Sequence, residues 1–98
     1  MAKLEAKEVE RQLKSLPGWE YKDNAIHKLF RFKEFMEGIQ FINQVAGAAE
    51  AMDHHPDINI NYTRITFLCT SHDSGGVTER DFKLAKAIEE AYVARSVN

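Results

Sequence analysis

The sequence predicts an α+β fold, in which three helices pack on one face of a four-stranded antiparallel sheet. Three segments show the apolar spacing of amphipathic helices, and between them lie two pairs of short segments rich in aromatic or alternating apolar residues. A tight turn separates the members of each pair, so each pair is expected to form an antiparallel hairpin. The resulting order, α-β-β-α-β-β-α, is satisfied most simply by a sheet with helices covering its apolar face.

The chain has 98 residues, of which 44% are hydrophobic and 29% charged, and this predicts a single domain over residues 1–98. A chain this short buries roughly 60–65% of the surface that it exposes when unfolded, a smaller share than a larger domain buries, and this favours self-association. The formal charge of −2 and the scattered basic residues disfavour direct nucleic-acid binding. No apolar run reaches the roughly 18 residues that span a bilayer, and the N-terminal residues lack the order of a signal peptide. Together with the lone Cys69, these features predict a cytoplasmic protein without a membrane partner.

The first third of the chain is expected to form a helix and a hairpin. The helix is expected over residues 4–16, where apolar side chains recur at helical spacing until Pro17-Gly18 stops it. Residues 19–22 and 25–32 are rich in aromatic and aliphatic side chains and are expected to form the first strand pair. Asp23-Asn24 between them tolerates the left-handed backbone of a tight hairpin turn.

The second helix is expected over residues 33–52. Pro56 places its end at about Asp53-His54, because the residue before a proline is pushed out of helical geometry. The apolar stripe predicted to be buried contains Phe35, Met36, Ile39, Ile42, Val45, Ala46 and Ala49. A second, weaker stripe contains Phe41, Ala48 and Met52. Because this second stripe would face outward, we predict that the helix contributes to an interface between copies of the chain.

The second hairpin is predicted from two segments, residues 58–62 and 65–69, with apolar side chains at every second position. Both strands are expected to be half-buried. A polar loop follows over residues 70–77, where glycines allow backbone conformations that other residues resist. Thr78 and Asp81 have the spacing of a capping box and predict the start of the last helix. The apolar stripe of that helix contains Phe82, Ala85, Ile88 and Tyr92.

Three of the four histidines stand at the ends of predicted elements. His54 and His55 precede the third strand, and His72 lies in the loop after the fourth. Because the start of one strand in an antiparallel hairpin is adjacent to the end of its partner, the three imidazoles are expected to converge. Asp81, in the first turn of the last helix, reaches the same rim. The sequence thus predicts a cluster of three imidazoles and one carboxylate, at the kind of loop edge where sites form.

Such a cluster suits proton transfer, because an imidazole titrates near neutral pH and can act as an acid or a base. Two histidines in opposite protonation states could remove water from a substrate without a metal ion or a covalent intermediate. Dehydration is therefore the predicted reaction class. Three histidines and nearby carboxylates could also bind zinc, but the adjacent pair lacks the i, i+4 spacing that points two rings at one ion.

Each of these residues also has a purely structural interpretation. The pair His54-His55 could have no role other than to end the helix, with its imidazoles at the negative end of the helix dipole. Asp81 could serve only as a helix cap. Glu50, one turn before His54, could be a solvated residue or could orient that imidazole. Cys69 alternates toward the core, so a buried thiol is expected rather than a nucleophile.

Several stretches of the sequence together resemble the pterin-4a-carbinolamine dehydratase family, also known as DCoH. They are residues 50–57 (EAMDHHPD), Tyr62, residues 70–73 (TSHD) and residues 78–81 (TERD). The similarity extends from about Trp19 through the last helix and includes the FRFKEF stretch before the second helix. One departure is Ile58, where animal members often carry a bulky aromatic residue. It affects the packing of the pocket rim and leaves the proton chemistry untouched.

The resemblance implies an enzyme that removes water from 4a-hydroxytetrahydropterin to give quinonoid dihydropterin, with no metal or organic cofactor. This is the tetrahydrobiopterin recycling step that follows aromatic amino-acid hydroxylation, so a hydroxylase is the implied pathway partner. The implied catalytic residues are His54, His55, His72 and Asp81. The implied substrate-binding residues are Asp53, His54, His55, Thr70, Ser71, His72 and Asp73. We expect one of His54 and His72 to protonate the departing hydroxyl and the other to accept the N5 proton, while His55 orients the pterin.

The resemblance also implies a second function class. Animal members of the family act as dimerisation cofactors for a homeodomain transcription factor, so a scaffold without catalysis is the alternative. The three histidines at one rim favour the enzyme, whereas the outward stripe on the second helix would serve a scaffold. In either case a homodimer or homotetramer is predicted.

Overall fold

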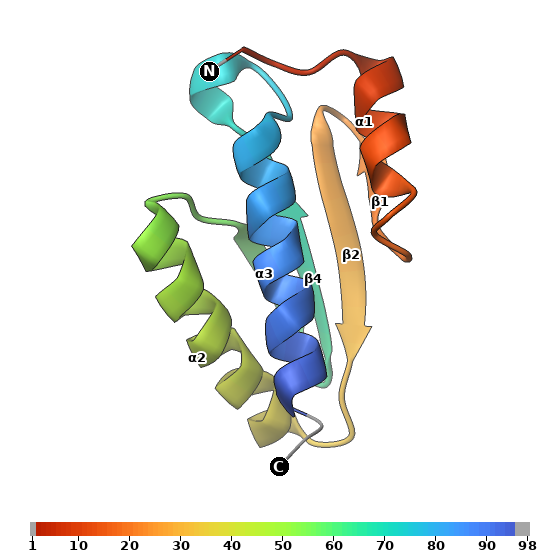
Figure 1. Cartoon of the computed structure of the whole chain (residues 1–98). Helices are drawn as coiled ribbons and strands as arrows, with labels where there is room; N and C mark the ends of the chain where they lie inside the picture. The colour runs from red at the N-terminus through yellow and green to blue at the C-terminus, as the bar shows by residue number, and fades with distance from the viewer. Residues whose placement is uncertain (1, 96–98) are drawn as a thin grey trace.

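A computed structural model describes residues 2–95, which contain three α-helices and one four-stranded sheet. The helices are α1 (Ala6–Leu13), α2 (Phe35–Met52) and α3 (Glu79–Arg95). The strands are β1 (Glu20–Lys22), β2 (Ala25–Arg31), β3 (Asp57–Asn61) and β4 (Arg64–Cys69), and a 3₁₀ turn, η1 (His72–Ser74), follows β4. The predicted order, α-β-β-α-β-β-α, is confirmed (Figure 1).

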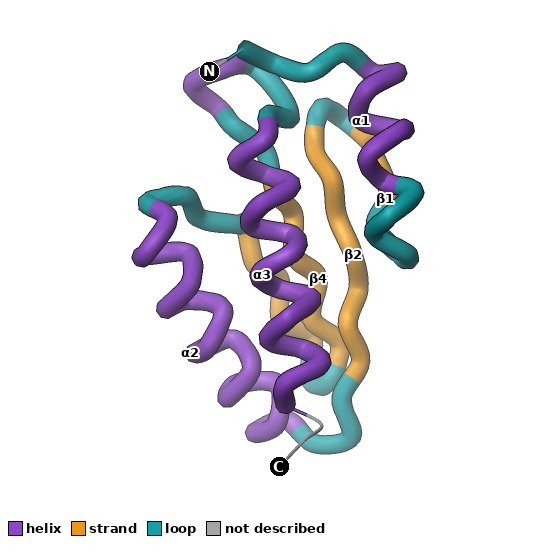
Figure 2. Tube along the Cα trace, viewed as in Figure 1, coloured by secondary structure: helices purple, strands orange, loops and turns teal. Residues whose placement is uncertain are grey.

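The sheet is antiparallel throughout, with the strand order β1-β2-β4-β3. Helices α2 and α3 lie over one face of the sheet, and α1 lies beside β1, so the predicted two-layer fold is confirmed (Figures 1 and 2). In the β3–β4 hairpin, Asp57 is paired with Leu68. The start of β3 therefore lies next to the end of β4, and the segments that precede and follow this hairpin come together.

Both hairpin turns contain residues with left-handed backbone. Asp23 and Asn24 have φ angles of 52° and 63°, as expected for the short-turn residues that tolerate this conformation best. Tyr62, which was predicted to belong to the third strand, instead lies in the β3–β4 turn with a φ of 54°. The strand therefore ends at Asn61.

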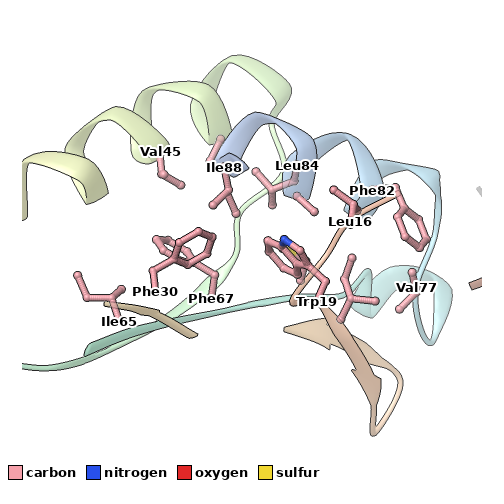
Figure 3. Close-up of a cluster of buried hydrophobic side chains, with 14 of the residues drawn as sticks. Leu16, Trp19, Phe30, Val45, Ile65, Phe67, Val77, Phe82, Leu84 and Ile88 are labelled. Atoms are coloured by element: carbon pink, nitrogen blue, oxygen red, sulfur yellow. The ribbon is translucent and has the colours of Figure 1, made fainter. Parts of the chain in front are cut away.

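The hydrophobic core lies between the helices and the sheet (Figure 3). Phe30 of β2 and Phe67 of β4 face Leu84 and Ile88 of α3, and all four side chains are buried. The rings of Phe30 and Phe67 meet edge to face, with 5.7 Å between their centroids. Within residues 2–95, none of the helices has the length and apolar character needed to cross a membrane.

The predicted buried face of α2 is partly wrong. Phe41, assigned to the outward stripe, is only 2% exposed, whereas Met36, assigned to the buried stripe, is 57% exposed. The buried residues of the helix are Gly38, Phe41, Val45 and Ala49. A Cβ atom added at Gly38 would lie 2.7 Å from Cδ1 of Ile65, so the helix approaches the sheet closely at this glycine. The sequence pattern favoured burial of the helix face with more large side chains. The structure instead buries the face that carries Gly38, because a glycine lets the helix approach the sheet closely.

Two other predicted boundaries or burials differ from the structure. The first helix covers residues 6–13 rather than 4–16, although Leu16 beyond its end is buried in the core. The prediction that both strands of the second hairpin are half-buried is wrong for β3, where every residue is exposed and Ile60 reaches 47%. The reason is topological, because β3 is an edge strand with a neighbour on one side only.

Candidate active site

The C-terminal end of α2 sets the position of His54. Asp53 follows the helix with left-handed backbone, at φ 53° and ψ 40°, and the backbone N–H of His54 donates to the carbonyl of Ala49 at 3.1 Å. This turn reverses the chain, and Pro56 prevents the helix from continuing. The predicted end of the second helix at about residues 53–54 therefore agrees with the structure, and the end itself carries the first site histidine.

A buried hydrogen bond joins His54 to the start of α3. Nε2 of His54 lies 2.6 Å from Oδ1 of Asp81, and the exposed fractions of the two residues are 9% and 0%. The second carboxylate oxygen, Oδ2, accepts hydrogen bonds from the hydroxyl of Ser71 at 2.9 Å and from the backbone N–H of Thr78 at 2.9 Å. One buried carboxylate thus connects the end of α2, the loop after β4 and the first turn of α3.

The hydroxyl groups near Asp81 form an ordered chain. The Ser71 hydroxyl donates its one hydrogen to Asp81, so in its 2.9 Å contact with Thr78 it accepts the hydrogen of the Thr78 hydroxyl. The Thr78 oxygen in turn accepts from the backbone N–H of Arg80 at 3.2 Å. The predicted capping box is present in part: Asp81 caps the N–H of Thr78, but the Thr78 hydroxyl binds the N–H of Arg80 rather than that of Asp81.

A hollow of about 270 Å³ opens beside this network. It is lined by Asp53, His54, His55, Thr70, Ser71, His72, Asp73 and Arg80. The structure therefore brings together all seven residues that the sequence resemblance implied for substrate binding. Asp81 is not among the lining residues, because its side chain is buried behind His54. The roles of the lining residues and of Asp81 in binding and catalysis remain predictions.

His55 and His72 lie at the exposed rim of the hollow. Nε2 of His55 is 2.5 Å from Oε2 of Glu50, and both side chains are more than half exposed. Glu50, considered as a residue that orients His54, therefore pairs with His55 instead. His72 begins the turn η1, which is closed by backbone hydrogen bonds between Ser71 and Gly76.

Arg80 is the lining residue that sequence reasoning missed. Its Nη2 atom lies 2.6 Å from Oδ1 of Asp73, and this hydrogen bond ties the turn η1 to the start of α3. The hydrogen bond from Arg80 lowers the pKa of Asp73, and the contact raises the pKa of Arg80 above its ordinary value. The only sequence signal was that Arg80 adjoins Asp81, and this does not indicate which loop its side chain reaches.

Two other kinds of chemistry at this site would be a nucleophilic thiol and a bound metal ion. Cys69 is buried, and burial raises the pKa of its thiol, so the residue is a poor nucleophile, as expected. Within residues 2–95, no group of three or more His, Cys, Asp or Glu side chains has an arrangement that could hold a metal ion. The chemical groups available in the hollow are thus imidazoles, carboxylates, hydroxyls and one guanidinium.

Comparison with known proteins identifies the family of the chain. Residues 2–91 match the model of a family described as pterin 4 alpha carbinolamine dehydratase. The chain belongs to this family. A relative that carries the dehydratase name, from Koribacter versatilis, is 51% identical over 85 residues, which cover 87% of this chain and 90% of the relative. Another, from Sulfolobus acidocaldarius, is 42% identical over 88 residues, which cover 90% and 97%.

Solved structures extend the comparison with the dehydratase family. A Brucella melitensis protein, described as a transcriptional coactivator/pterin dehydratase, superposes with a TM-score of 0.87 at 35% identity, covering 91% of this chain and 97% of that one. A pterin dehydratase-like protein, described as a RuBisCO assembly factor of the alpha-carboxysome, has a TM-score of 0.62 at 19% identity and shares the fold alone. Sequence and fold therefore both place the chain among the pterin-4a-carbinolamine dehydratases.

Proposed function

We propose that the protein dehydrates 4a-hydroxytetrahydropterin to quinonoid dihydropterin by histidine acid–base catalysis. In this reaction the C4a–O bond breaks, the hydroxyl accepts a proton and leaves as water, and N5 loses a proton as the C4a=N5 bond forms. The step needs one acid and one base. The observation that carries the proposal is a single hollow lined by three imidazoles, one of which is paired with a buried carboxylate.

His54 is proposed as the base. The Asp81 carboxylate is positioned to accept the hydrogen of Nε2, and a neutral imidazole held in this tautomer has its lone pair on Nδ1. Nδ1 is then the nitrogen that can accept the N5 proton. The imidazolium formed in this way is stabilised by the adjacent carboxylate, which acts as a positioning residue and does not touch the substrate.

His72 is proposed as the acid that protonates the departing hydroxyl. It lies on the exposed turn η1, where solvent can return its proton after each turnover. His55, paired with Glu50, is proposed to orient the pterin. The carboxylates of Asp53 and Asp73 line the same hollow and are suited to accept hydrogen bonds from the N–H groups of the pterin ring.

The test is the rate of dehydration above the spontaneous rate. A purified aromatic amino-acid hydroxylase generates the carbinolamine, and its decay is followed by absorbance. We expect His54→Ala and His72→Ala to lower the catalysed rate by roughly 10²–10⁴-fold. The control is His27→Ala, a histidine of β2 outside the hollow, which should keep the wild-type rate. A wild-type protein that leaves the spontaneous rate unchanged would contradict the proposal.

A scaffold is the second candidate function. The similar Brucella melitensis protein is described as a transcriptional coactivator as well as a pterin dehydratase, and β3 of this chain exposes the apolar side chains of Ile58 and Ile60. The same assay separates the two candidates, because a scaffold has no need to accelerate dehydration. An unaccelerated reaction together with a stable oligomer would favour the scaffold.

We further propose that two copies of the chain associate through β3, as a homodimer or within a homotetramer. This edge strand has the sequence DININ, and it contains neither the lysine nor the proline that often protects exposed edges. Next to it, the exposed rings of Phe35 and Tyr62 stack with 6.4 Å between their centroids and extend the apolar surface. A second β3 strand would cover this surface and pair the free edge.

A further inference from the structure

A second hollow, of about 190 Å³, adjoins the candidate active site. It is lined by Met52, His54, Arg80 and Lys83, and it shares His54 and Arg80 with the first hollow. Its residues come from the last turn of α2, the residues that follow it, and the first two turns of α3. The two shared residues make the second hollow a continuation of the site.

The two hollows differ in charge. The first is lined by two carboxylates, Asp53 and Asp73, whereas none lines the second, which has the cations Arg80 and Lys83. Arg80 is partly neutralised by its ion pair with Asp73. Within residues 2–95, no carboxylate lies within ion-pairing distance of Lys83. The second hollow therefore favours an anion.

The chemistry of the substrate indicates which part of the ligand would reach this second hollow. In a 6-substituted pterin, C6 is bonded to N5, and N5 is bonded to C4a, from which the hydroxyl leaves. If His54 exchanges a proton with N5, the side chain on C6 begins beside His54. Since His54 lines both hollows, the second hollow is the adjoining space that such a side chain can enter.

We infer that the second hollow binds a phosphate at the end of the C6 side chain, so that the substrate class is a phosphorylated pterin. This inference rests on the proposed function. A hollow of about 190 Å³ has room for a phosphate and a short linker. Lys83 supplies an ammonium for the phosphate and Arg80 supplies guanidinium N–H donors.

The test compares two product-like ligands by calorimetry on the full chain, 7,8-dihydroneopterin and its 3′-phosphate. We expect the phosphate ester to bind about tenfold more tightly at low salt, the size of one charge-assisted contact. This preference should shrink as the salt concentration rises, because ions screen the attraction. Equal affinities of the wild-type protein for the two ligands would overturn the inference.

Two matched variants test whether Lys83 causes the preference for the phosphate ester. Lys83→Gln is expected to bring the ratio of the two affinities close to one. Lys86→Gln removes the same charge one turn further along α3, outside both hollows, and should keep the wild-type ratio. A Lys83→Gln variant that retains the full preference would overturn the inference.

The result for the phosphate site can be distinguished from the result for the proposed function. Acceleration of the dehydration of an unphosphorylated carbinolamine tests the function, whereas the ratio of the two binding affinities tests the phosphate site. A protein that accelerates dehydration and binds both ligands equally contradicts the phosphate site alone. A protein that prefers the phosphate ester but never accelerates dehydration contradicts the proposed reaction, and with it the assignment of the bound phosphate to a substrate.

Discussion

At the scale of single residues, Asp81 connects the fold of this chain to its proposed chemistry. One carboxylate oxygen contacts His54, and the other accepts hydrogen bonds from Ser71 and from the backbone of Thr78. The structural and functional interpretations of Asp81 were alternatives when only the sequence was considered. In the structure the same side chain makes both sets of contacts, so helix capping and histidine positioning do not compete.

We predict that Asp81→Asn lowers kcat by about 10- to 100-fold and changes KM much less, because the variant loses the anion that orients and stabilises His54. It should also lower the free energy of unfolding by about 1–3 kcal/mol, because an amide cannot accept all the hydrogen bonds that the carboxylate accepts. Steady-state kinetics and urea unfolding measure the two effects.

The control for Asp81→Asn is Glu79→Gln, which removes a carboxylate from the same turn of α3. Glu79 is exposed and accepts a hydrogen bond from Gln12 rather than contacting a histidine. Its kinetics should match those of the wild-type protein. A loss of stability in Asp81→Asn without any fall in kcat would show that the aspartate is a cap only.

The Asp73–Arg80 pair leads to a prediction of pH dependence. The hydrogen bond from Arg80 lowers the pKa of Asp73 below its ordinary 3.8, so the pair stabilises the folded state above that pH, and the effect is lost as pH falls. Asp73→Asn should therefore be less stable than the wild type at pH 7, by a small margin because the pair is exposed. This difference should shrink as the pH falls below 3.8 and through the lowered pKa of Asp73, where the wild-type carboxyl becomes protonated as well. Urea unfolding over a series of pH values from 7 downward measures it, and a difference independent of pH would contradict the prediction.

At the scale of elements, the packing of α2 shows where sequence patterns are insufficient. The length and end of the helix followed from its periodicity and from Pro56, but its rotation about its own axis did not. The prediction placed large side chains such as Phe35 and Met36 on the buried face, whereas the observed buried face contains Gly38. A missing side chain contributes nothing to a hydrophobic pattern, even where it allows the closest contact.

The two glycines of α2 provide a matched test of this packing. At Gly38 an added Cβ would lie 2.7 Å from Ile65, whereas at Gly47 it would meet nothing within 4 Å. Gly38→Ala should lower the free energy of unfolding by about 1–3 kcal/mol through overpacking. Gly47→Ala should raise it by about 0.5–1 kcal/mol, because alanine favours the helix. Urea unfolding of both variants measures the contrast, and equal effects would contradict the close approach.

At the scale of the whole molecule, the exposed strand β3 leaves the sheet open at one edge. A short chain with a small core gains stability by covering such a surface. The predicted interface on the second helix assumed that Phe41 faced outward, and this residue is instead in the core. Large exposed apolar side chains gather at β3, at the turn that follows it and at the start of α2, whereas Leu29, Met52 and Val93 are exposed elsewhere. The proposed interface therefore moves to β3.

We predict that the wild-type protein sediments as a dimer or tetramer at micromolar concentration and that Ile60→Lys sediments as a monomer. A lysine on an edge strand must be buried if a second strand pairs with it, and this opposes association. Leu29→Lys is the control, because Leu29 is also exposed but lies on β2 inside the sheet. A wild-type monomer, or an Ile60→Lys variant with the wild-type mass, would contradict the proposed interface.

The sequence by itself determined the order of the elements, the first hairpin turn and the meeting of His54, His55 and His72. These features depend on local periodicity, on turn residues and on the geometry of an antiparallel hairpin, all of which can be read along the chain. Only the tertiary structure decided which face of α2 is buried, which histidine Asp81 contacts, and that Arg80 reaches Asp73. Those contacts depend on helix rotation and on distances of a few ångströms between segments remote in sequence, which no periodic pattern specifies.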